Sequence, residues 1–131
     1  MDWIDSIGGA EFLRKLFSQP PSLHGVRVID FGLQQDGPRV LISFDLNEYP
    51  DEPPAKWVQA QANRVQIRLM GIGVRELELR GWSANNIADI KVTAAAPDAV
   101  ALICHGDGFF LKAIFDHLAI DRVSAYRDET E

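Results

Sequence analysis

The stretch RVLISFDL, residues 39–46, decides the fold that we expect for this chain. Every second residue in it is apolar, namely Val40, Ile42, Phe44 and Leu46. Because successive side chains of a strand point to opposite faces, this alternation is typical of a β-strand that packs one face on a core. The stretch therefore predicts a strand with these four residues pointing inward.

Strand patterns continue on both sides of this stretch. Residues 25–33 (GVRVIDFGL) precede it, and residues 34–38 (QQDGP) have the composition of a hairpin turn. Residues 63–70 (NRVQIRLM) alternate again, and a short turn at residues 71–73 leads into a further strand at residues 74–79 (VRELEL). The apolar members of these alternating patterns are Val65, Ile67, Leu69, Leu77 and Leu79.

Further strand candidates complete a sheet. They are IADIKV (87–92), VALICH (100–105), FFLKAIF (109–115) and the segment ending IDRVSAY (120–126). Turn signals separate them at Asn85-Asn86, Pro97-Asp98 and Gly106-Asp107-Gly108. About eight strands at hairpin distance, without helices long enough for parallel crossovers, predict an antiparallel meander.

A short helix precedes the strands. Residues 8–18 (GGAEFLRKLFS) place Phe12, Leu13, Leu16 and Phe17 on one apolar stripe, and a proline pair then ends the helix. A helix this short needs a flat apolar surface to dock on. We therefore expect an α+β fold, with one N-terminal helix packed on a large, mainly antiparallel sheet, in a single domain over residues 1–131.

Charge and composition exclude several functions. The 131 residues carry 13 basic and 19 acidic side chains, a net charge of −6, which disfavours nucleic acid as a partner. A single cysteine, Cys104, favours a reducing compartment. The first residues lack the pattern of a signal peptide, and the apolar run AVALIC is far shorter than the roughly 20 residues that span a bilayer. We expect a cytoplasmic protein that does not enter a membrane.

No motif predicts catalysis, a cofactor or a metal site. The sequence has no metal-ligand spacing, no GxSxG elbow and no phosphate-binding loop. The HGDG segment at residues 105–108 is typical of a hairpin turn. Glu76 and Glu78 share the outer face of a strand, where solvated carboxylates are common, and Cys104 lies in an apolar strand. We therefore expect neither an enzyme nor a cofactor-binding protein.

The segment NEYPDEPPAKW, residues 47–57, is the most unusual part of the chain and permits two interpretations. As scaffold, its prolines keep a crossing between sheet edges extended, while Tyr49 and Trp57 tie the ends of the loop to the body. As a contact surface, residues 45–56 carry four carboxylates and one lysine, a net charge of −3, on a stiff loop that would attract a basic partner. Trp82 has the same two interpretations, as a core residue or as an exposed anchor.

Several aromatic and proline motifs, in this order, resemble the immunity protein 50 family of bacterial polymorphic-toxin systems. The resemblance runs over residues 3–126. The segments that carry it are Trp3, Phe17, PSLH (21–24), RVLISFDL (39–46), PDEPPAKW (50–57), RVQIRL (64–69) and Gly81-Trp82. Ser18 departs from the pattern, because a glycine is typical there.

This resemblance implies a cytoplasmic antidote that binds the catalytic domain of a neighbouring toxin, without enzyme activity or cofactor. A non-catalytic ligand-binding or regulatory accessory domain is the alternative. The sequence does not decide between a monomer and a dimer. The residues expected to contact a toxin with a basic surface are Asp45, Glu48, Tyr49, Asp51, Glu52 and Trp82. The residues expected to be structural are Trp3, Phe17, Pro53, Pro54 and Trp57.

Overall fold

A computed structural model describes residues 3–129 of the chain. Its strands are β1 (Val26–Gln34), β2 (Arg39–Asp45), β3 (Arg64–Arg80), β4 (Asn86–Ala96), β5 (Ala99–Gly106) and β6 (Phe110–Tyr126). Its helices are short: the 3-10 helix η1 (Trp3–Ser6), α1 (Glu11–Leu16) and α2 (Ala55–Gln59). The protein is therefore mostly antiparallel β-sheet, as expected, while the helical part is minor.

The strands form a closed barrel in the order β1-β2-β3-β6-β5-β4, and every neighbouring pair is antiparallel. The expected meander is correct for β1-β2-β3 and for β4-β5-β6. It is wrong at the junction, because β3 pairs with β6 and not with β4. Closure between β1 and β4 is short: it rests on the three pairs Val26↔Ala88, Arg27↔Ile87 and Val28↔Asn86.

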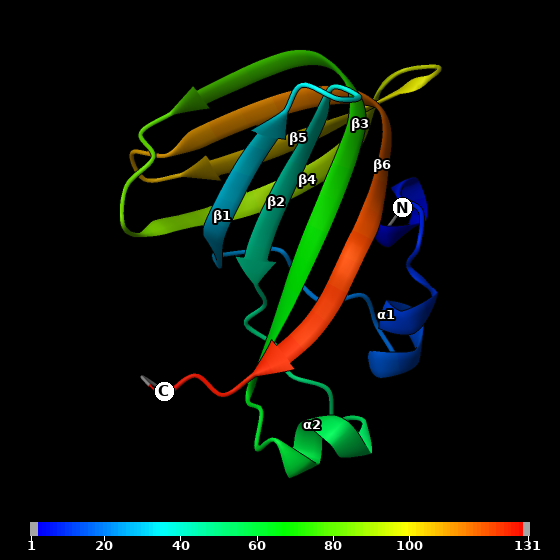
Figure 1. Cartoon of the computed structure of the whole chain (residues 1–131), viewed down its shortest axis with the longest axis vertical. Coiled ribbons are helices and arrows are strands. Elements are labelled where there is room, and N and C mark those ends of the chain that lie inside the picture. Colours follow the sequence, from blue (N-terminus) through cyan, green and yellow to red (C-terminus); the bar gives the residue numbers. More distant parts are fainter. Residues whose placement is uncertain (1–2, 130–131) are drawn as a thin grey trace.

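The expectation of eight strands is wrong, because β3 and β6 each unite two of the predicted strands. Residues 71–73 are a bend within β3 and not a turn: Gly73 has a φ of +75°, and the register shifts between Val74 and Glu76. A bulge of this kind turns a strand without ending it. Figure 1 shows β3 and β6 running side by side up the molecule and bending together at the top of the view.

The two halves of β3 therefore belong to two layers. Its first half lies between β2 and β6, in a layer formed with β1. Its second half pairs with the start of β6, which continues into β5 and β4. Strands that change layer at a bulge are a known way to build orthogonally packed sheets. At the bend, a Cβ on Gly71 would overlap the ring of Phe115, so only glycine fits there.

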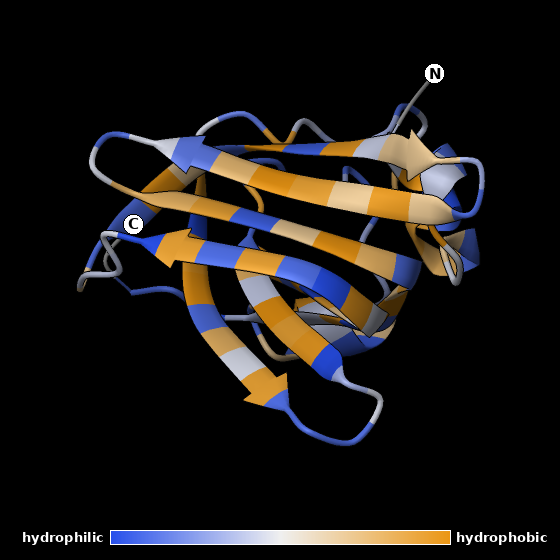
Figure 2. Cartoon of the chain, turned by 90° about the horizontal axis from the view of Figure 1, so that it is seen from above, coloured by the Kyte–Doolittle hydropathy of each residue, from blue (hydrophilic) through white to orange (hydrophobic). Residues whose placement is uncertain are grey.

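The core fills the space between these layers. The predicted inward positions of β2 and of the first half of β3 are confirmed, with at most 1% of each side chain exposed. Figure 2 shows the corresponding alternation of hydrophilic and hydrophobic residues along the strands. Burying each such side chain stabilises the fold by about 1.5–3 kcal/mol relative to leaving it exposed. The largest fully buried members of the core are Phe44, Phe115, Leu13, Ile42, Leu46, Ile67, Leu69, Leu102 and Leu111.

The N-terminal segment lies beside β6 (Figure 1). Gly8 forms an isolated parallel bridge with Ala119 of β6. The expected apolar stripe of α1 is only partly buried, since Leu13 is covered while Phe12 is 41% exposed. Trp3 is half-buried and its indole N–H donates to the carbonyl of Pro21 at 2.9 Å, which is a structural role of the kind expected.

Candidate functional site

The proline loop connects β2 to β3, and its path corrects one expectation. Because β2 and β3 are neighbours in the barrel, the loop does not cross between sheet edges. It is also not extended throughout, since Pro54 precedes the one-turn helix α2 and its carbonyl accepts from the N–H groups of Trp57 and Val58. A proline suits this position because it directs the chain into a helix with its φ already fixed.

Hydrogen bonds hold the first residues of the loop to the segment before β1. The side-chain amide of Asn47 donates to the carbonyls of His24 (3.0 Å) and Gly25 (2.9 Å). The carboxylate of Glu48 accepts from the backbone N–H of Ser22 at 2.6 Å. The loop is therefore fixed before any partner binds, which limits the entropy that it loses on binding.

Aromatic packing holds the far end of the loop to α1. Trp57 lies edge-on to Phe12, with ring centroids 6.0 Å apart, and tilted against Tyr49 at 6.3 Å. Trp57 and Tyr49 are half-buried and pack against the core, which is the placement that the scaffold interpretation predicts. Such edge and tilted pairs add about 0.5–1.5 kcal/mol beyond the area that they bury.

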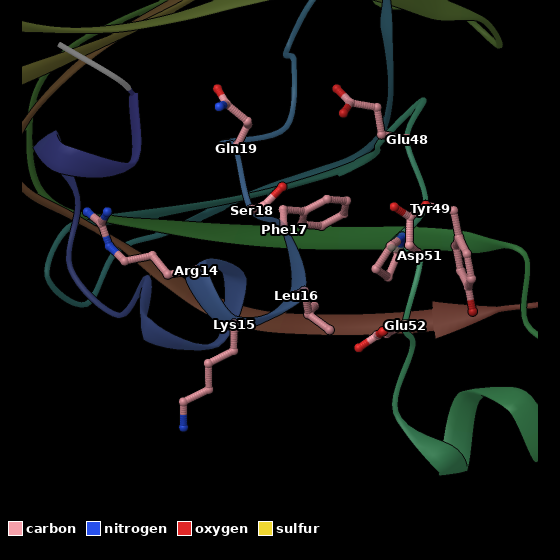
Figure 3. Close-up of a pocket in the computed structure, with 11 residues that line it drawn as sticks. Arg14, Lys15, Leu16, Phe17, Ser18, Gln19, Glu48, Tyr49, Asp51 and Glu52 are labelled. Atoms are coloured by element: carbon pink, nitrogen blue, oxygen red, sulfur yellow. The ribbon is translucent and has the colours of Figure 1, made fainter.

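A groove of about 550 Å³ separates the loop from the end of α1 (Figure 3). We call it the acidic groove. Residues 48–52 form one wall, and residues 14–19 form the other. Glu48, Asp51 and Glu52 make the loop wall negative, and Figure 3 shows Glu52 pointing toward the α1 side.

The two walls carry charges of opposite sign, with Arg14 and Lys15 on the α1 wall and three carboxylates on the loop wall. On the α1 wall, Arg14 pairs with Asp5 at 2.7 Å. Asp51 and Glu52 are exposed and have no ion-pair partner within residues 3–129. The carboxylates that remain accessible are therefore on the loop wall, where they can attract a cationic partner.

Tyr49 also lines the groove. Its hydroxyl is buried and neither donates nor accepts a hydrogen bond within the described residues. Burial raises the pKa of this phenol above its ordinary value. Tyr49 therefore stays neutral at physiological pH. Its ring contributes packing to the groove, and its predicted role as a partner contact rests on the part of the ring that remains exposed.

The prediction of Asp45 as a partner contact needs correction. Its side chain is only 2% exposed, although it points to the face of β2 opposite to Phe44 and Leu46. Its carboxylate accepts from the hydroxyl of Tyr126 at 2.6 Å, from Arg27 at 3.0 Å and from Gln66 at 3.4 Å. A buried carboxylate with three donors is a structural group and does not present itself to a partner.

The carboxylate of Asp45 helps to raise the pKa values of two of its partners, Arg27 and Tyr126. The pKa of Arg27 is raised, mainly by its hydrogen bond to this carboxylate. The pKa of Tyr126 is raised mainly by burial and further by the hydrogen bond to Asp45, so the phenol keeps its proton and remains a donor. Asp128 extends the cluster, with oxygen atoms 3.8 Å from Arg27 and 3.5 Å from Arg64.

Trp82 lies away from the acidic groove and is 43% exposed. Its ring packs against Phe109 at 5.8 Å and against Phe31 at 6.5 Å. One part of the ring therefore covers the core, and the other part remains accessible. Phe17, Pro53 and Pro54 are half-buried, which is consistent with structural roles.

The groups considered for catalysis do not meet in one cleft. The pocket that contains His105 is lined by Arg80, the two glycines of the HGDG turn, Phe109 and Phe110, without either Glu76 or Glu78. The turn itself is confirmed, since the N–H of Gly106 donates to the carbonyl of Phe109 at 2.8 Å. Cys104 is fully buried, and burial raises the pKa of its thiol to about 12, so it is not a nucleophile near neutral pH.

Within residues 3–129, no group of three or more His, Cys, Asp or Glu side chains is arranged to hold a metal ion. Among the described helices, none has the length and apolarity needed to cross a membrane.

Sequence reasoning missed the second wall of the groove. Residues 14–19 meet the loop only because Trp57 packs on Phe12, a contact between positions 45 residues apart (57 − 12). No local pattern contains this information. The aromatic residues at positions 12 and 57 were the one available signal, because aromatic rings tend to pack against one another.

Together, the fold and the groove define a small β-barrel protein with an acidic groove on its surface. The family model described as Immunity protein 50 matches residues 9–126, which is most of the chain. This chain therefore belongs to the Immunity protein 50 family, as the resemblance of its motifs indicated. Membership implies, in general terms, a toxin as partner. No curated protein and no solved structure gives a significant match.

Proposed function

We propose that this protein is a cytoplasmic immunity protein that neutralises the catalytic domain of a cognate polymorphic toxin by binding it. The proposal includes no enzyme activity and no cofactor. Family membership supports the immunity role. The acidic groove supports the mode of binding, because Asp51 and Glu52 present accessible negative charge on a loop that is fixed at both ends.

The physical reason is electrostatic complementarity. A toxin that acts on nucleic acid or another anionic substrate needs a basic surface around its active site. Carboxylates on a fixed loop attract such a surface at long range and lose little entropy when it docks. We therefore expect a partner with a basic surface, whose association with this protein weakens as the salt concentration rises.

The experiment is co-expression with the C-terminal domain of the toxin encoded beside this chain, scored by growth and by recovery of a complex. The double variant Asp51→Lys/Glu52→Lys should then slow association by about tenfold or more at low salt. The double variant Asp36→Lys/Asp107→Lys is the control, because it makes the same charge change in exposed turns outside the groove.

The outcomes bear separately on the immunity role and on the groove. Growth rescue with a co-purifying complex supports the immunity role, and slow association of the groove variant alone supports the groove. Equal association of both double variants would remove the groove from the interface. No rescue, with both proteins soluble, would refute the immunity role for this pair and favour the accessory-domain alternative, which melting-temperature shifts with metabolites would then test.

A further inference from the structure

The protein covers several of its strand edges with its own chain. The N-terminal segment covers the second half of β6, where the N–H of Gly8 donates to the carbonyl of Leu118 and the N–H of Ile120 donates to the carbonyl of Gly8. The segment before β1 covers β4, where the N–H of Ile90 donates to the carbonyl of Leu23, and η1 packs beside it. Such coverage is how proteins keep sheet edges from pairing with other chains.

The second half of β3 has no such cover. Residues 66–72 of β3 pair with β2 on one side, but residues 76–80 pair with β6 alone among the described strands. Hydrogen bonds from Gly73 and Val74 to the carbonyl of Pro38 end the coverage at the bend. Because backbone groups point alternately to the two sides of a strand, residues 75–80 present N–H and C=O groups along an open edge.

The inner face beside this edge is apolar and accessible. Leu77 and Leu79 lie opposite Ala113 and Leu111 of β6, both fully buried, so the four side chains share the inner face. Leu77 is nevertheless 36% exposed and Leu79 is 37% exposed. Trp82, two residues after the strand ends, leaves 43% of its surface accessible. A strand added at the usual spacing of about 4.8 Å would cover these side chains.

The unpaired edge of β1 is less suited to pairing. Beyond Val28, β1 pairs with β2 only, but a bulge between Val28 and Asp30 breaks its register and Gly32 follows. Bulges and glycines make an edge irregular and discourage the addition of a strand. By contrast, β3 is regular from Glu76 to Arg80.

We propose that residues 75–80 of β3 form a second contact for the toxin and accept one of its β-strands in the manner of strand addition. This inference rests on the proposed function, since the toxin supplies the strand. Main-chain hydrogen bonds along the edge would give affinity, and the side chains above and below it would select the sequence that binds.

The charges beside the edge define the strand that fits. Arg75 is occupied by Asp116 at 2.6 Å and Asp98 at 3.4 Å, and Arg80 by Glu78 at 3.0 Å and by the ring of Phe110. Glu76 lies on the outer face and has no ion-pair partner within residues 3–129. The complementary strand therefore carries apolar residues toward the leucines and a lysine or arginine on the opposite face.

The same charges disfavour a second copy of this chain as the occupant. In an antiparallel pairing of two copies, facing Leu77 with Leu79 places Glu78 opposite Glu78. Facing Leu77 with Leu77 places Glu76 opposite Glu78. Like charges directly opposite each other destabilise a strand pair in these two registers. A third register faces Leu79 with Leu79 and sets Glu78 opposite Arg80, but it leaves Leu77 facing Gly81, so a heterologous strand covers both leucines better.

Amide hydrogen exchange of the protein with and without the toxin domain tests the backbone part of the proposal. We expect every second amide within residues 75–80 to exchange rapidly in the free protein and to become protected in the complex, because its N–H gains a partner on the toxin strand. Contact through side chains alone would leave these amides unprotected.

Substitution tests the side-chain part. Leu77→Glu should weaken toxin binding by about tenfold or more, since the added strand would bury the new carboxylate. Ile87→Glu is the matched control: Ile87 is a strand aliphatic that is 41% exposed on the outer face of β4, and the same charge is added there. Melting temperatures of both variants establish that each is folded.

The outcomes separate this inference from the proposed function. Protection of residues 75–80 together with selective weakening by Leu77→Glu supports strand addition. A complex in which these amides stay unprotected and Leu77→Glu binds like Ile87→Glu would refute it, while the immunity role stands. Protection that appears with protein concentration in the absence of toxin, together with a dimer in sedimentation, would overturn it in favour of a second copy. Absence of any complex refutes both.

Discussion

The buried carboxylate of Asp45 provides the sharpest test of the structure. We consider Asp45→Asn, which keeps the shape of the side chain and removes its charge. In the wild type this carboxylate is 2% exposed and accepts from a phenol at 2.6 Å and a guanidinium at 3.0 Å. Hydrogen bonds to a charged group contribute about 1.5–3 kcal/mol each. The substitution weakens two of them.

Solvent exposure reduces the share of Arg27 in this loss of stability. Arg27 is 43% exposed, so water can solvate its guanidinium after the substitution, and its share of the loss is small. The phenol of Tyr126 is more deeply placed and depends on the carboxylate as acceptor. We therefore expect Asp45→Asn to lower the free energy of unfolding by about 2–3 kcal/mol.

The assay is urea unfolding at pH 7, followed by fluorescence and circular dichroism. The control is Tyr126→Phe, which removes only the hydroxyl and should cost about 1–2 kcal/mol. The double variant should cost less than the sum of the two single variants, because both remove the same hydrogen bond. A loss below about 0.5 kcal/mol for Asp45→Asn, or strictly additive losses, would refute the burial and bonding described here.

Three further predictions concern packing and pH. Trp57→Ala should lower the free energy of unfolding in urea by about 1.5–3 kcal/mol. This is less than the loss of about 3–5 kcal/mol for a fully buried ring, because Trp57 is only half-buried. An unchanged free energy of unfolding would show that Trp57 does not anchor the loop. Gly71→Ala should cost about 1–3 kcal/mol because the new methyl group overlaps the buried ring of Phe115, and a melting temperature equal to that of the wild type would contradict this. Cys104 keeps its proton in the folded state up to a pKa of about 12, whereas the unfolded thiol ionises near 9.0, so its contribution to stability is fully present below pH 9 and falls as pH rises toward 12. The free energy of unfolding, measured from pH 8 to pH 10.5, should therefore decline less steeply in Cys104→Ala than in the wild type. Equal slopes in the two proteins would exclude the thiol as the cause.

The sequence predicted the features that local patterns encode. Alternation at Val40, Ile42 and Phe44 identified a strand and its buried face, and the glycines of HGDG identified a turn. In each case the physical cause lies within a few residues, either in the pleat of a strand or in the φ freedom of glycine.

Features that depend on distant residues were not predictable in this way. Glycines at positions 71 and 73 indicate a turn and a bend equally well, and only the long pairing with β6 shows that the strand continues. The burial of Asp45 depends on Tyr126, 81 positions away, so a count of local charge placed it on the surface. The sequence singled out the acidic loop, but the opposite wall of its groove comes from α1 and the residues after it, which no pattern in the loop reveals.

The pairing of β3 with β6 has a consequence for the order in which the protein folds. Its two ends close chain loops of different length: Arg80 and Phe110 are 30 positions apart (110 − 80), whereas Arg64 and Tyr126 are 62 apart (126 − 64). Since the entropy cost of closure grows with the logarithm of loop length, the near end is favoured by about 0.6 kcal/mol. The intervening chain is β4 and β5, which form a hairpin of their own and shorten the effective loop further. We therefore expect the layer formed by the second half of β3, the start of β6, β5 and β4 to assemble first. The pairing of β3 with β6 then extends toward the C-terminal end of β6. The carboxylate of Asp45 would gain its phenol last, and the open edge of β3 would be in place before the barrel closes.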